Sequence, residues 1–305
     1  MCDGCNKSEG LAIKLHARKI IVTSLAKLLL TAVSLMMASS AYSWGSLGHQ
    51  VVCDIAWRAS SPSVQRELSA ASKRMGYKTF ADSCTWADKI KSQSRYDDLK
   101  PLHYMNLSRH QQSVSSTDCL HARSPQCVLT AIEHYSHIMN RASVSQTERD
   151  KALLLVGHFV ADIHQPLHVS YKGDRGGTRK KVNFKGKSSN LHRLWDTQLL
   201  YCQKVEGKHP TWRRLGESLF SGAKNIDDEL ESEMTQSEIN RNDLTLTVSQ
   251  WAQESFDITR QIYGELGRSS KTIYLSDDYC VRYYPVAISR LQQAGKRLSV
   301  LLQQI

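Results

Sequence analysis

The sequence has no hydrophobic run long enough to cross a membrane. The apolar segment LLLTAVSLMM, directly behind Lys27, has ten residues, whereas a membrane-spanning helix needs about 20. Internal repeats and low-complexity linkers are also missing, which excludes a repeat architecture and gives no sign of a second domain. No basic amphipathic helix of the kind that binds membrane surfaces stands out. We therefore expect no stable membrane association.

The same apolar segment is typical of a secretory signal peptide. Basic residues precede it, and Ala41 and Ser43 occupy the two positions of a small-x-small cleavage site. This pattern predicts cleavage between Ser43 and Trp44, with residues 1–43 removed. A protein exported in this way is secreted or periplasmic.

The remaining residues, 44–305, number 262 and are enough for one domain with a large core. Residues 1–43 hold five of the 40 Lys and Arg and two of the 29 Asp and Glu, so their removal lowers the net charge from +11 to +8. A basic exported protein suits a polyanionic partner, although excess basic charge also serves solubility.

Cysteine content indicates disulfides. Cys2 and Cys5 leave with the signal peptide, and an even number in an exported chain is typical of a disulfide framework. The six that remain are Cys53, Cys84, Cys119, Cys127, Cys202 and Cys280. The short spacing of Cys119 and Cys127 favours a loop staple, and we then prefer Cys53–Cys84 and Cys202–Cys280. Fifteen pairings of six cysteines remain open.

Most of the chain after Trp44 predicts helix, from apolar residues at helical spacing and from capping signals. The segment 147–166, TERDKALLLVGHFVADIHQP, is apolar nearly all round and predicts a buried central helix. The glycine-rich segment YKGDRGGTRKKVNFKGKSS alternates over 181–185 and predicts a hairpin or flap. Further helices are expected over 61–72, 124–142, 190–201, 243–266 and 285–305, with prolines at the starts of the first, second and last. The fold class is therefore mainly α, a single compact multi-helix domain with a small β-hairpin.

The central helix carries polar residues that its apolar surroundings do not explain. His158 and Asp162 lie four residues apart and so project from one face, and His168 follows in the turn after Pro166. A carboxylate in an apolar helix is unfavourable unless it is paired. One such pair is also explained as a His–Asp ion pair in the core.

The same spacing recurs, which favours a metal cluster over an isolated ion pair. His192 and Asp196 are again four residues apart in NLHRLWD, Asp88 lies in TWADK, His103 in PLHYMN, and His49 near the expected new terminus. Imidazole and carboxylate are the ligands of catalytic zinc, which takes three of them and keeps an open position. Five His and three Asp exceed what one ion requires.

Several motifs together resemble the single-strand-specific zinc nucleases of the S1/P1 type. They are WGSLGH at the expected mature start, WAD, LHYMN, HFVADIHQPLH and NLHRLWD, in this order over residues 44–196. The resemblance implies the helical fold shared by these nucleases and zinc phospholipases C, and hydrolysis of single-stranded DNA and RNA to 5′-phosphate products. It leaves 3′-nucleotidase activity open, and we expect a monomer.

The resemblance also implies three zinc ions and their ligands. The first ion is expected on Asp88, His103, His158 and Asp162. The second takes the backbone of Trp44 and the His49 side chain, with Asp162 bridging to the first. The third takes His168, His192 and Asp196. Asp88 and Asp162 are thus predicted catalytic residues.

Trp44 is a ligand only if its amine is free. An α-amino group has a pKa of about 7.7–8, so zinc can displace its proton near neutral pH. An uncleaved chain would have an amide there, which does not coordinate in this way. Cleavage at Ser43 would then complete the metal site.

Three further residues match positions that contact the substrate in these nucleases. Lys91, three residues after Asp88, is expected to steady the phosphate in the transition state. Asn106 is expected in the base pocket, and Tyr104 to stack on a nucleobase, although Tyr104 also fits a core position. The basic segment 179–187 can follow the phosphate backbone or simply aid solubility.

Two other functions remain. A zinc phospholipase C shares the tryptophan-first helical fold, but its pattern around the first ligands differs from WGSLGHQ. A non-catalytic periplasmic zinc-binding protein explains ligands and disulfides, but it needs neither a terminal chelate nor Lys91.

Overall fold

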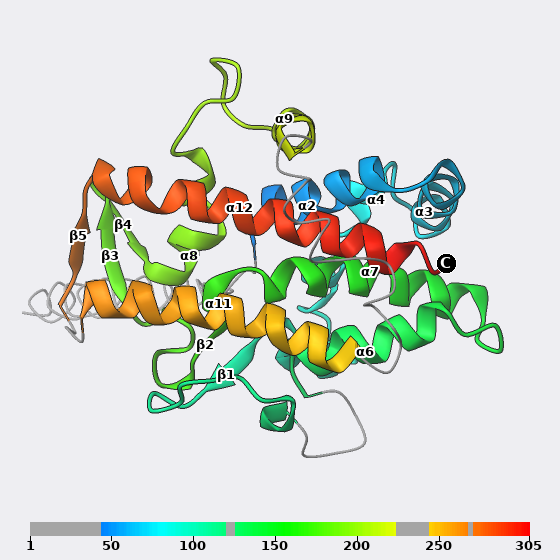
Figure 1. Cartoon of the computed structure of the whole chain (residues 1–305), viewed down its shortest axis with the longest axis horizontal. Helices are drawn as coiled ribbons and strands as arrows, with labels where there is room; N and C mark the ends of the chain where they lie inside the picture. Colours follow the sequence, from blue (N-terminus) through cyan, green and yellow to red (C-terminus); the bar gives the residue numbers. More distant parts are fainter. Residues whose placement is uncertain (1–43, 120–125, 224–243, 268–270) are drawn as a thin grey trace, which may run out of the picture. The chain divides into compact units, whose positions relative to one another are not determined.

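Helices make up most of the structure (Figure 1), which confirms the prediction of a mainly α fold. The computed structural model describes residues 44–119, 126–223, 244–267 and 271–305, all in one compact unit. The α-helices are α2 (Ser46–Ala59), α3 (Pro62–Arg74), α4 (Phe80–Ser83), α5 (Trp86–Ile90), α6 (Val128–Met139), α7 (Gln146–Ile163), α8 (Leu191–Asp196), α9 (Trp212–Ala223), α11 (Leu244–Leu266) and α12 (Asp277–Leu302). The 3₁₀ helices are η1 (Ser94–His103), η2 (Ser116–Cys119), η3 (Pro166–His168), η4 (Lys172–Asp174) and η5 (Gln198–Tyr201).

Capping side chains determine where two of the expected helices begin. Helix α3 follows Ser61, whose hydroxyl accepts a hydrogen bond from Val64 N, and Pro62 occupies the first helical position as expected. Helix α7 was expected to be capped by Thr147, but its cap is Ser145, two residues earlier, which forms a capping box with Glu148. Because these signals are local, the sequence was sufficient to predict both helices.

Two other helix starts differ from expectation. The expected start of α6 at residues 124 and 125 lies outside the described residues, and the helix begins at Val128 with Cys127 as its N-cap. The last helix was expected to begin at Pro285, which is wrong, because α12 begins at Asp277 and contains Pro285. A proline inside a helix leaves the carbonyl four residues earlier without its partner. That residue is Val281, which is 74% exposed, so water can reach its carbonyl.

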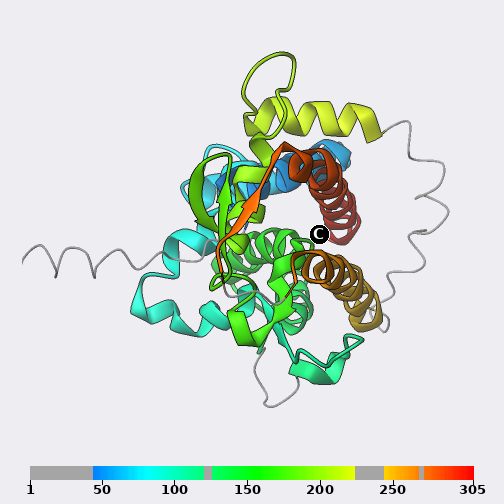
Figure 2. The same ribbon diagram turned by 90° about the vertical axis from the view of Figure 1, so that its left-hand side faces the viewer.

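Helix α7 occupies the centre of the fold, as predicted. Figures 1 and 2 place α2 and α12 on one side of it and α6 and α11 on the other, and α7 contacts all four. Every residue from Ala152 to Ile163 is buried. A Cβ at Gly157 would lie 2.8 Å from Cys84 Sγ and 3.1 Å from Cys53 Sγ, so a glycine is needed for this close approach.

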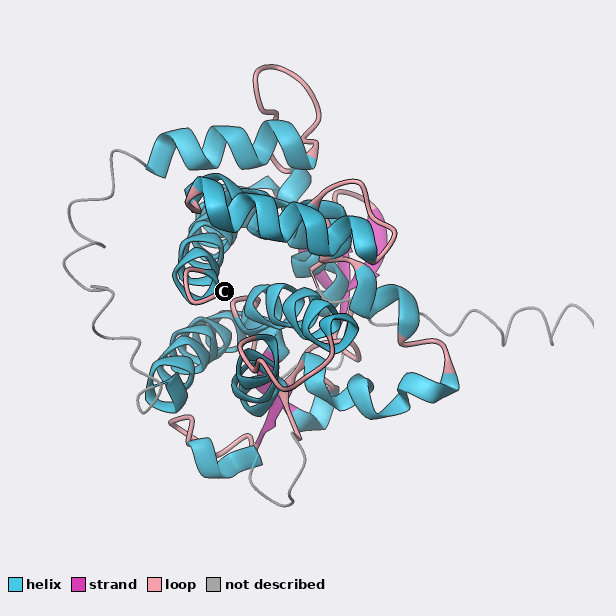
Figure 3. Ribbon diagram, turned by 90° about the vertical axis from the view of Figure 1, so that its right-hand side faces the viewer, coloured by secondary structure: helices cyan, strands magenta, loops and turns pink. Residues whose placement is uncertain are grey.

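The strands are few and short (Figure 3). Strand β1 (Met105–Leu107) pairs in parallel with β2 (Val169–Tyr171). The predicted hairpin is confirmed as β3 (Lys181–Phe184) and β4 (Lys187–Asn190), which pair antiparallel. Strand β5 (Ile273–Leu275) adds to β3 in parallel, a pairing that the sequence did not indicate.

Three disulfides form, in the pairs that the sequence analysis preferred. Cys53–Cys84 joins α2 to the end of α4, Cys119–Cys127 closes a short loop before α6, and Cys202–Cys280 joins the end of η5 to α12. Among the described residues, no helix is both long and apolar enough to cross a membrane.

Candidate metal centre

The predicted histidine and aspartate ligands come from six elements and lie together in the interior. Three sets of side chains are close enough to hold an ion, each with its ligand atoms within 4.8 Å of one another. The first group is His49, Asp88 and His158; the second group is His103, His158 and Asp162; the third group is His168, His192 and Asp196. We call the first and second, which share His158, the paired groups.

Asp162 is the centre of the paired groups. Its Oδ2 lies 3.0 Å from His103 Nδ1 and 3.2 Å from His158 Nε2, and its Oδ1 lies 3.4 Å from His49 Nε2. The rings of His49 and His158 stack with their centroids 3.8 Å apart. Asp88 lies farther out, with its oxygens 3.8–4.0 Å from the three imidazoles. This arrangement places one carboxylate where two ions can share it.

The third group lies on the other side of Asp162. His192 Nε2 is 3.5 Å from Asp196 Oδ2, at the spacing of four residues along α8, and His168 Nε2 is 3.8 Å from Asp196 Oδ1. His168 Nδ1 is 3.5 Å from Asp162 Oδ1, so the third group adjoins the paired groups.

Backbone carbonyls orient three of the imidazoles. The Nδ1–H of His158 donates to Cys84 O (2.7 Å), that of His168 to His103 O (2.6 Å), and that of His192 to Gly176 O (2.8 Å). Metal-binding histidines usually donate their second ring nitrogen in this way, which fixes the tautomer. In all three rings Nε2 is then the nitrogen directed into the groups.

Burial and neighbouring charges keep most of these imidazoles neutral. Burial, helped by the neighbouring His158, lowers the pKa of His49 to about 3, and burial likewise lowers the pKa of His192 to about 3. Burial also lowers the pKa of His103. Neutral imidazole is the form that binds a metal ion.

Two of the three carboxylates, Asp88 and Asp196, differ in charge. Burial opposes ionisation of Asp88, but His158, His49 and Lys91 outweigh it and lower its pKa to about 2. Burial raises the pKa of Asp196 well above its ordinary value, opposed by a hydrogen bond from Gln165. The paired groups therefore offer an ionised carboxylate, whereas the third group needs a cation before Asp196 ionises.

The donor set fits a metal better than it fits a hydrogen-bonded core. His158 Nε2 and His103 Nδ1 lie 3.0 Å apart. The proton on Nδ1 of His158 is already used in the hydrogen bond to Cys84 O. Within the described part of the chain, three buried atoms of the groups find no hydrogen-bond partner: His103 Nε2, Asp162 Oδ1 and His168 Nε2. Buried polar atoms are nearly always paired, so a cation is the partner that this set lacks.

Trp44 adjoins two of the helices that carry residues of the groups. It is fully buried, and its side chain packs so closely on Gly48 that a Cβ there would lie 2.9 Å from Trp44 Cβ. The next residue, Gly45, donates from its backbone N to Asp196 O (2.7 Å). The residue therefore adjoins both α2, which carries His49, and α8, which carries the third group.

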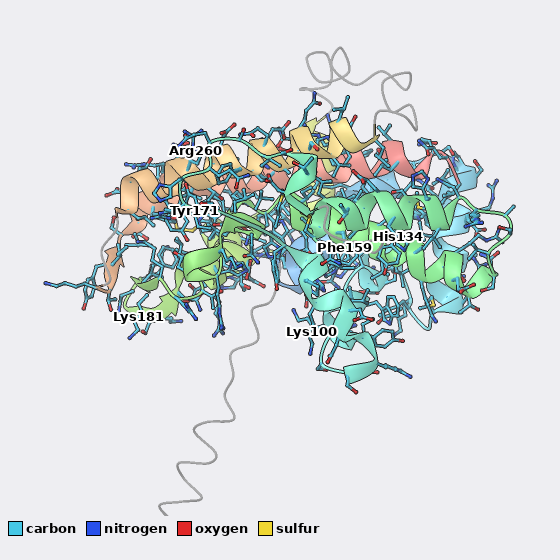
Figure 4. All side chains as sticks on the ribbon, turned by 90° about the horizontal axis from the view of Figure 1, so that it is seen from below. Lys100, His134, Phe159, Tyr171, Lys181 and Arg260 are labelled. Carbon is cyan, nitrogen blue, oxygen red and sulfur yellow. A yellow bond between two sulfur atoms is a disulfide. The ribbon has the colours of Figure 1, made fainter. Side chains whose placement is uncertain are left out.

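The predicted substrate residues lie around the paired groups. Lys91 Nζ is 2.7 Å from Asp88 Oδ1, and its side chain is 16% exposed. Tyr104 is 39% exposed and Asn106 is exposed on β1, directly after His103. Tyr104 is therefore not a core residue. Phe159 (Figure 4) packs edge-on against the His103 ring, with centroids 5.3 Å apart.

Sequence reasoning missed the residues that support the ligands. Gln165 Nε2 donates to Asp196 Oδ1 (2.5 Å), while its Oε1 accepts from Leu167 N (2.6 Å). The sequence did carry a signal for Gln165. A polar side chain between Asp162 and His168, in an apolar segment, needs hydrogen-bond partners. The buried His164 has a structural role: its Nδ1–H donates to Val160 O (2.7 Å) and its Nε2 accepts from Arg297 Nη1 (2.9 Å).

Comparisons with known proteins agree with this geometry. Endonuclease 2 of Arabidopsis thaliana is 28% identical over 285 residues, covering 91% of this chain and 96% of that protein. Nuclease S1 of Aspergillus oryzae is 31% identical over 171 residues, covering 56% of this chain and 59% of its own. Nuclease P1 of Penicillium citrinum is 29% identical over 167 residues, covering 54% and 61%. The model of the S1/P1 nuclease family matches residues 44–305, and the chain belongs to this family.

Proposed function

We propose that this nuclease is a zinc-dependent endonuclease that cleaves single-stranded DNA and RNA and leaves 5′-phosphates. The observation that carries the proposal is the three adjoining His/Asp groups, with Asp162 between the paired groups and the third. Zinc takes imidazole and carboxylate ligands and can keep an open position for water. The relatives named above are nucleases and endonucleases, which favours this function over a phospholipase C or a non-catalytic binder.

Nine residues are proposed as ligands of three zinc ions. They are Trp44 (through its backbone), His49, Asp88, His103, His158, Asp162, His168, His192 and Asp196. Such ions supply Lewis acidity and lower the pKa of water towards 7. Burial lowers the pKa of His49 and of His192 to about 3, and backbone carbonyls direct the Nε2 atoms of His158 and His192 inwards.

Lys91 is proposed to bind the scissile phosphate. Its ammonium pairs with Asp88, beside the paired groups. A cation bound at Asp88 would repel the ammonium, which then becomes available to a phosphate oxygen. Its position three residues from a ligand brings that charge to the reacting group.

Burial of the groups accounts for the preference for single strands. The ligands are at most 10% exposed at their side chains, so a phosphate can reach them only if the strand bends inwards and its bases unstack. Tyr104 and Asn106, exposed beside His103, are proposed to bind the freed base. A duplex resists this distortion.

The basic hairpin contributes less than its sequence indicated. Lys181, Lys185 and Lys187 are exposed and can contact phosphates. Lys185, however, pairs with Asp277 (2.8 Å), and Lys180 is buried and donates to Gly267 O (2.8 Å). We therefore assign the hairpin only a supporting, salt-dependent role in binding the strand.

Removal of residues 1–43 is proposed to complete the site. The proposed ligand at Trp44 is a free amine, which exists only after cleavage at Ser43. Export to an oxidising compartment, secreted or periplasmic, agrees with three disulfides. The comparison that tests the idea is zinc content and activity of two forms, one beginning at Trp44 and one with additional residues before it. Equal zinc binding and equal activity would contradict it.

The decisive experiment uses protein that begins at Trp44. Single-stranded DNA, RNA, duplex DNA, a 3′-mononucleotide and phosphatidylcholine are offered in parallel, with a chelator and with zinc added back. We expect zinc-restored cleavage of the single strands, with duplex and lipid untouched. The 3′-mononucleotide decides whether 3′-nucleotidase activity accompanies it, and gel filtration tests the expected monomer. Cleavage of lipid alone would support the phospholipase alternative, and no turnover the zinc-binding one.

A further inference from the structure

The turn after α7 connects the paired groups to the third group. Asp162 lies in the last turn of α7, and His168 ends η3 six residues later. The turn that links them is wholly buried. Any change in its path alters the distance between the two sets of proposed ligands.

Some carbonyls of this segment accept hydrogen bonds from backbone N–H groups within it. Ala161 O accepts from His164 N (3.2 Å), Asp162 O from Gln165 N (3.0 Å), and Gln165 O from His168 N (2.9 Å). These bonds are internal, so they define the shape of the turn and not its position in the protein.

Two hydroxyls of α11 bind other carbonyls of the turn. Ser255 Oγ donates to Ile163 O (2.5 Å), and Thr259 Oγ1 donates to Pro166 O (2.5 Å), which also accepts from Val169 N. Ser255 and Thr259 are four residues apart, so they share one face of α11, and both are fully buried. The hydroxyls thus attach both ends of the turn to a helix that carries none of the proposed ligands.

Arg290 of α12 completes the attachment. Its Nε donates to His164 O (3.2 Å), and its Nη2 donates to Ser255 Oγ (2.8 Å). Its charge is balanced by Glu254, which lies 2.5 Å from Nη1 and also pairs with Arg297. We call Ser255, Thr259 and Arg290 the α11–α12 clamp.

We propose that the α11–α12 clamp positions the turn so that Asp162 and His168 are at the separation that a three-ion site requires. The proposal rests on the trinuclear function proposed above. In the described part of the chain the clamp residues bind the turn through its backbone carbonyls, so they are positioning residues and not catalytic ones. A displacement of a reacting group by about 1 Å can lower a rate by about 100-fold. Hydrogen bonds at three carbonyls of the turn protect Asp162 and His168 from such a displacement.

Ser255→Ala and Thr259→Val test the clamp in the full mature chain. Ser60→Ala is a matched control, because Ser60 is buried and its hydroxyl donates to Ala56 O (2.8 Å) at the end of α2, distant in sequence from His49. Thr259→Val and Ser60→Ala each lose one buried hydrogen bond and Ser255→Ala loses two, so stability alone does not separate a clamp variant from the control. The discriminating readout is zinc affinity, measured by competition with a chromophoric chelator, together with kcat and KM on single-stranded DNA.

We expect the two clamp variants to bind the weakest-held zinc about 10–100-fold less tightly, with a comparable fall in kcat and little change in KM. Ser60→Ala should bind zinc as the wild type does, and Thr259→Ser should restore affinity because it keeps the hydroxyl. If Ser255→Ala does not fold, the shape-matched Thr259→Val carries the test.

Two results would overturn the proposal, and they are distinguishable. If the wild type binds zinc but the clamp variants match Ser60→Ala in affinity and kcat, the clamp is only structural and the proposed function stands. If the wild type takes up no zinc at all, both proposals fail.

Discussion

The paired groups and the third group use the same two residue types but differ in how the metal-free protein accommodates them. In the paired groups Asp88 has a pKa of about 2, because His158, His49 and Lys91 outweigh the effect of its burial. In the third group burial raises the pKa of Asp196, and the hydrogen bond from Gln165 and the charge of Lys91 do not outweigh it. The surroundings of the paired groups thus favour an ionised Asp88, whereas those of the third group favour a protonated Asp196.

The difference extends to the origin of the ligands. The paired groups draw on α2, α5, η1 and α7, with the disulfide Cys53–Cys84 beside them. The third group takes two of its three ligands from the short helix α8. We infer that the paired groups depend on the folded core and the third group on local geometry.

The largest expected effect comes from the residue that the paired groups depend on most. Asp162→Ala removes the carboxylate that lies within 3.4 Å of three imidazoles. A catalytic metal contributes several kcal/mol to the transition state, and about 1.4 kcal/mol is tenfold in rate, so we expect kcat/KM to fall by about 10³-fold or more. The measurement is cleavage of single-stranded DNA together with zinc content.

The matched variant in the third group is Asp196→Ala. It should remove one zinc ion, whereas Asp162→Ala should reduce occupancy of both paired groups. Equal zinc loss in the two variants would contradict the distinction between the groups.

Gln165→Ala is expected to weaken the third group alone. Its amide donates a hydrogen bond to Asp196 Oδ1, and loss of such a support typically lowers metal affinity about 10–100-fold. Titration with a chelator should show one ion released earlier and the other two unchanged. Early release of a second ion would show that the turn itself had moved, because Gln165 also binds Leu167 N.

The sequence indicated the residues of the three groups better than it indicated the groups that hydrogen-bond to them, for a physical reason. Four-residue spacing is visible in the sequence and places both side chains of a pair on one helix face. It marks His158 with Asp162 and His192 with Asp196. The carbonyls of Cys84, His103 and Gly176 that orient the imidazoles carry no such signal, because every residue has a carbonyl and its direction depends on the tertiary fold.

The fold shows the same limit. The central helix and the hairpin were predictable from local patterns, whereas β5 has only three residues and becomes a strand by pairing with β3. Pro285 was taken for a helix start, but Ser276 caps α12 earlier, with its hydroxyl accepting from Asp278 N. Exposure of Val281 makes the interior proline tolerable.

A smaller effect is expected on the substrate side of the paired groups. Tyr104 is 39% exposed, so a base stacked on it is only partly desolvated. Stacking contributes about 1–3 kcal/mol per base, and we take the lower end, which corresponds to about fivefold in KM for Tyr104→Ala. Tyr104→Phe keeps the ring and should leave KM unchanged. A loss of kcat with unchanged KM would instead mean that His103, its neighbour, had been displaced.

The smallest expected effect concerns the stability of protein from which metal has been removed. It compares how Asp196 and Asp88 change that stability with pH. The folded-state pKa of Asp196 is raised, so its contribution to stability is fully present below the unfolded value of about 3.9 and is lost as the pH rises through the folded value. Asp196→Asn cannot ionise and should therefore make metal-free protein more stable near neutral pH. Asp88 has the opposite sign, since its lowered pKa stabilises above about 3.9 and the contribution is lost as pH falls towards 2.

Urea unfolding of metal-free Asp196→Asn and Asp88→Asn at pH 5 and pH 7 measures both signs. About 1 kcal/mol moves the Tm of a chain of this size by only 2–4 °C, so unfolding free energies are the better readout. Stabilisation by Asp196→Asn and destabilisation by Asp88→Asn would sharpen the comparison. The third group would then hold an unfavourable carboxylate when no ion is bound, whereas the carboxylate of the paired groups would be favourable. Destabilisation by both would mean that Asp196 is paired as well as Asp88 is, and that the third group, too, favours an ionised carboxylate.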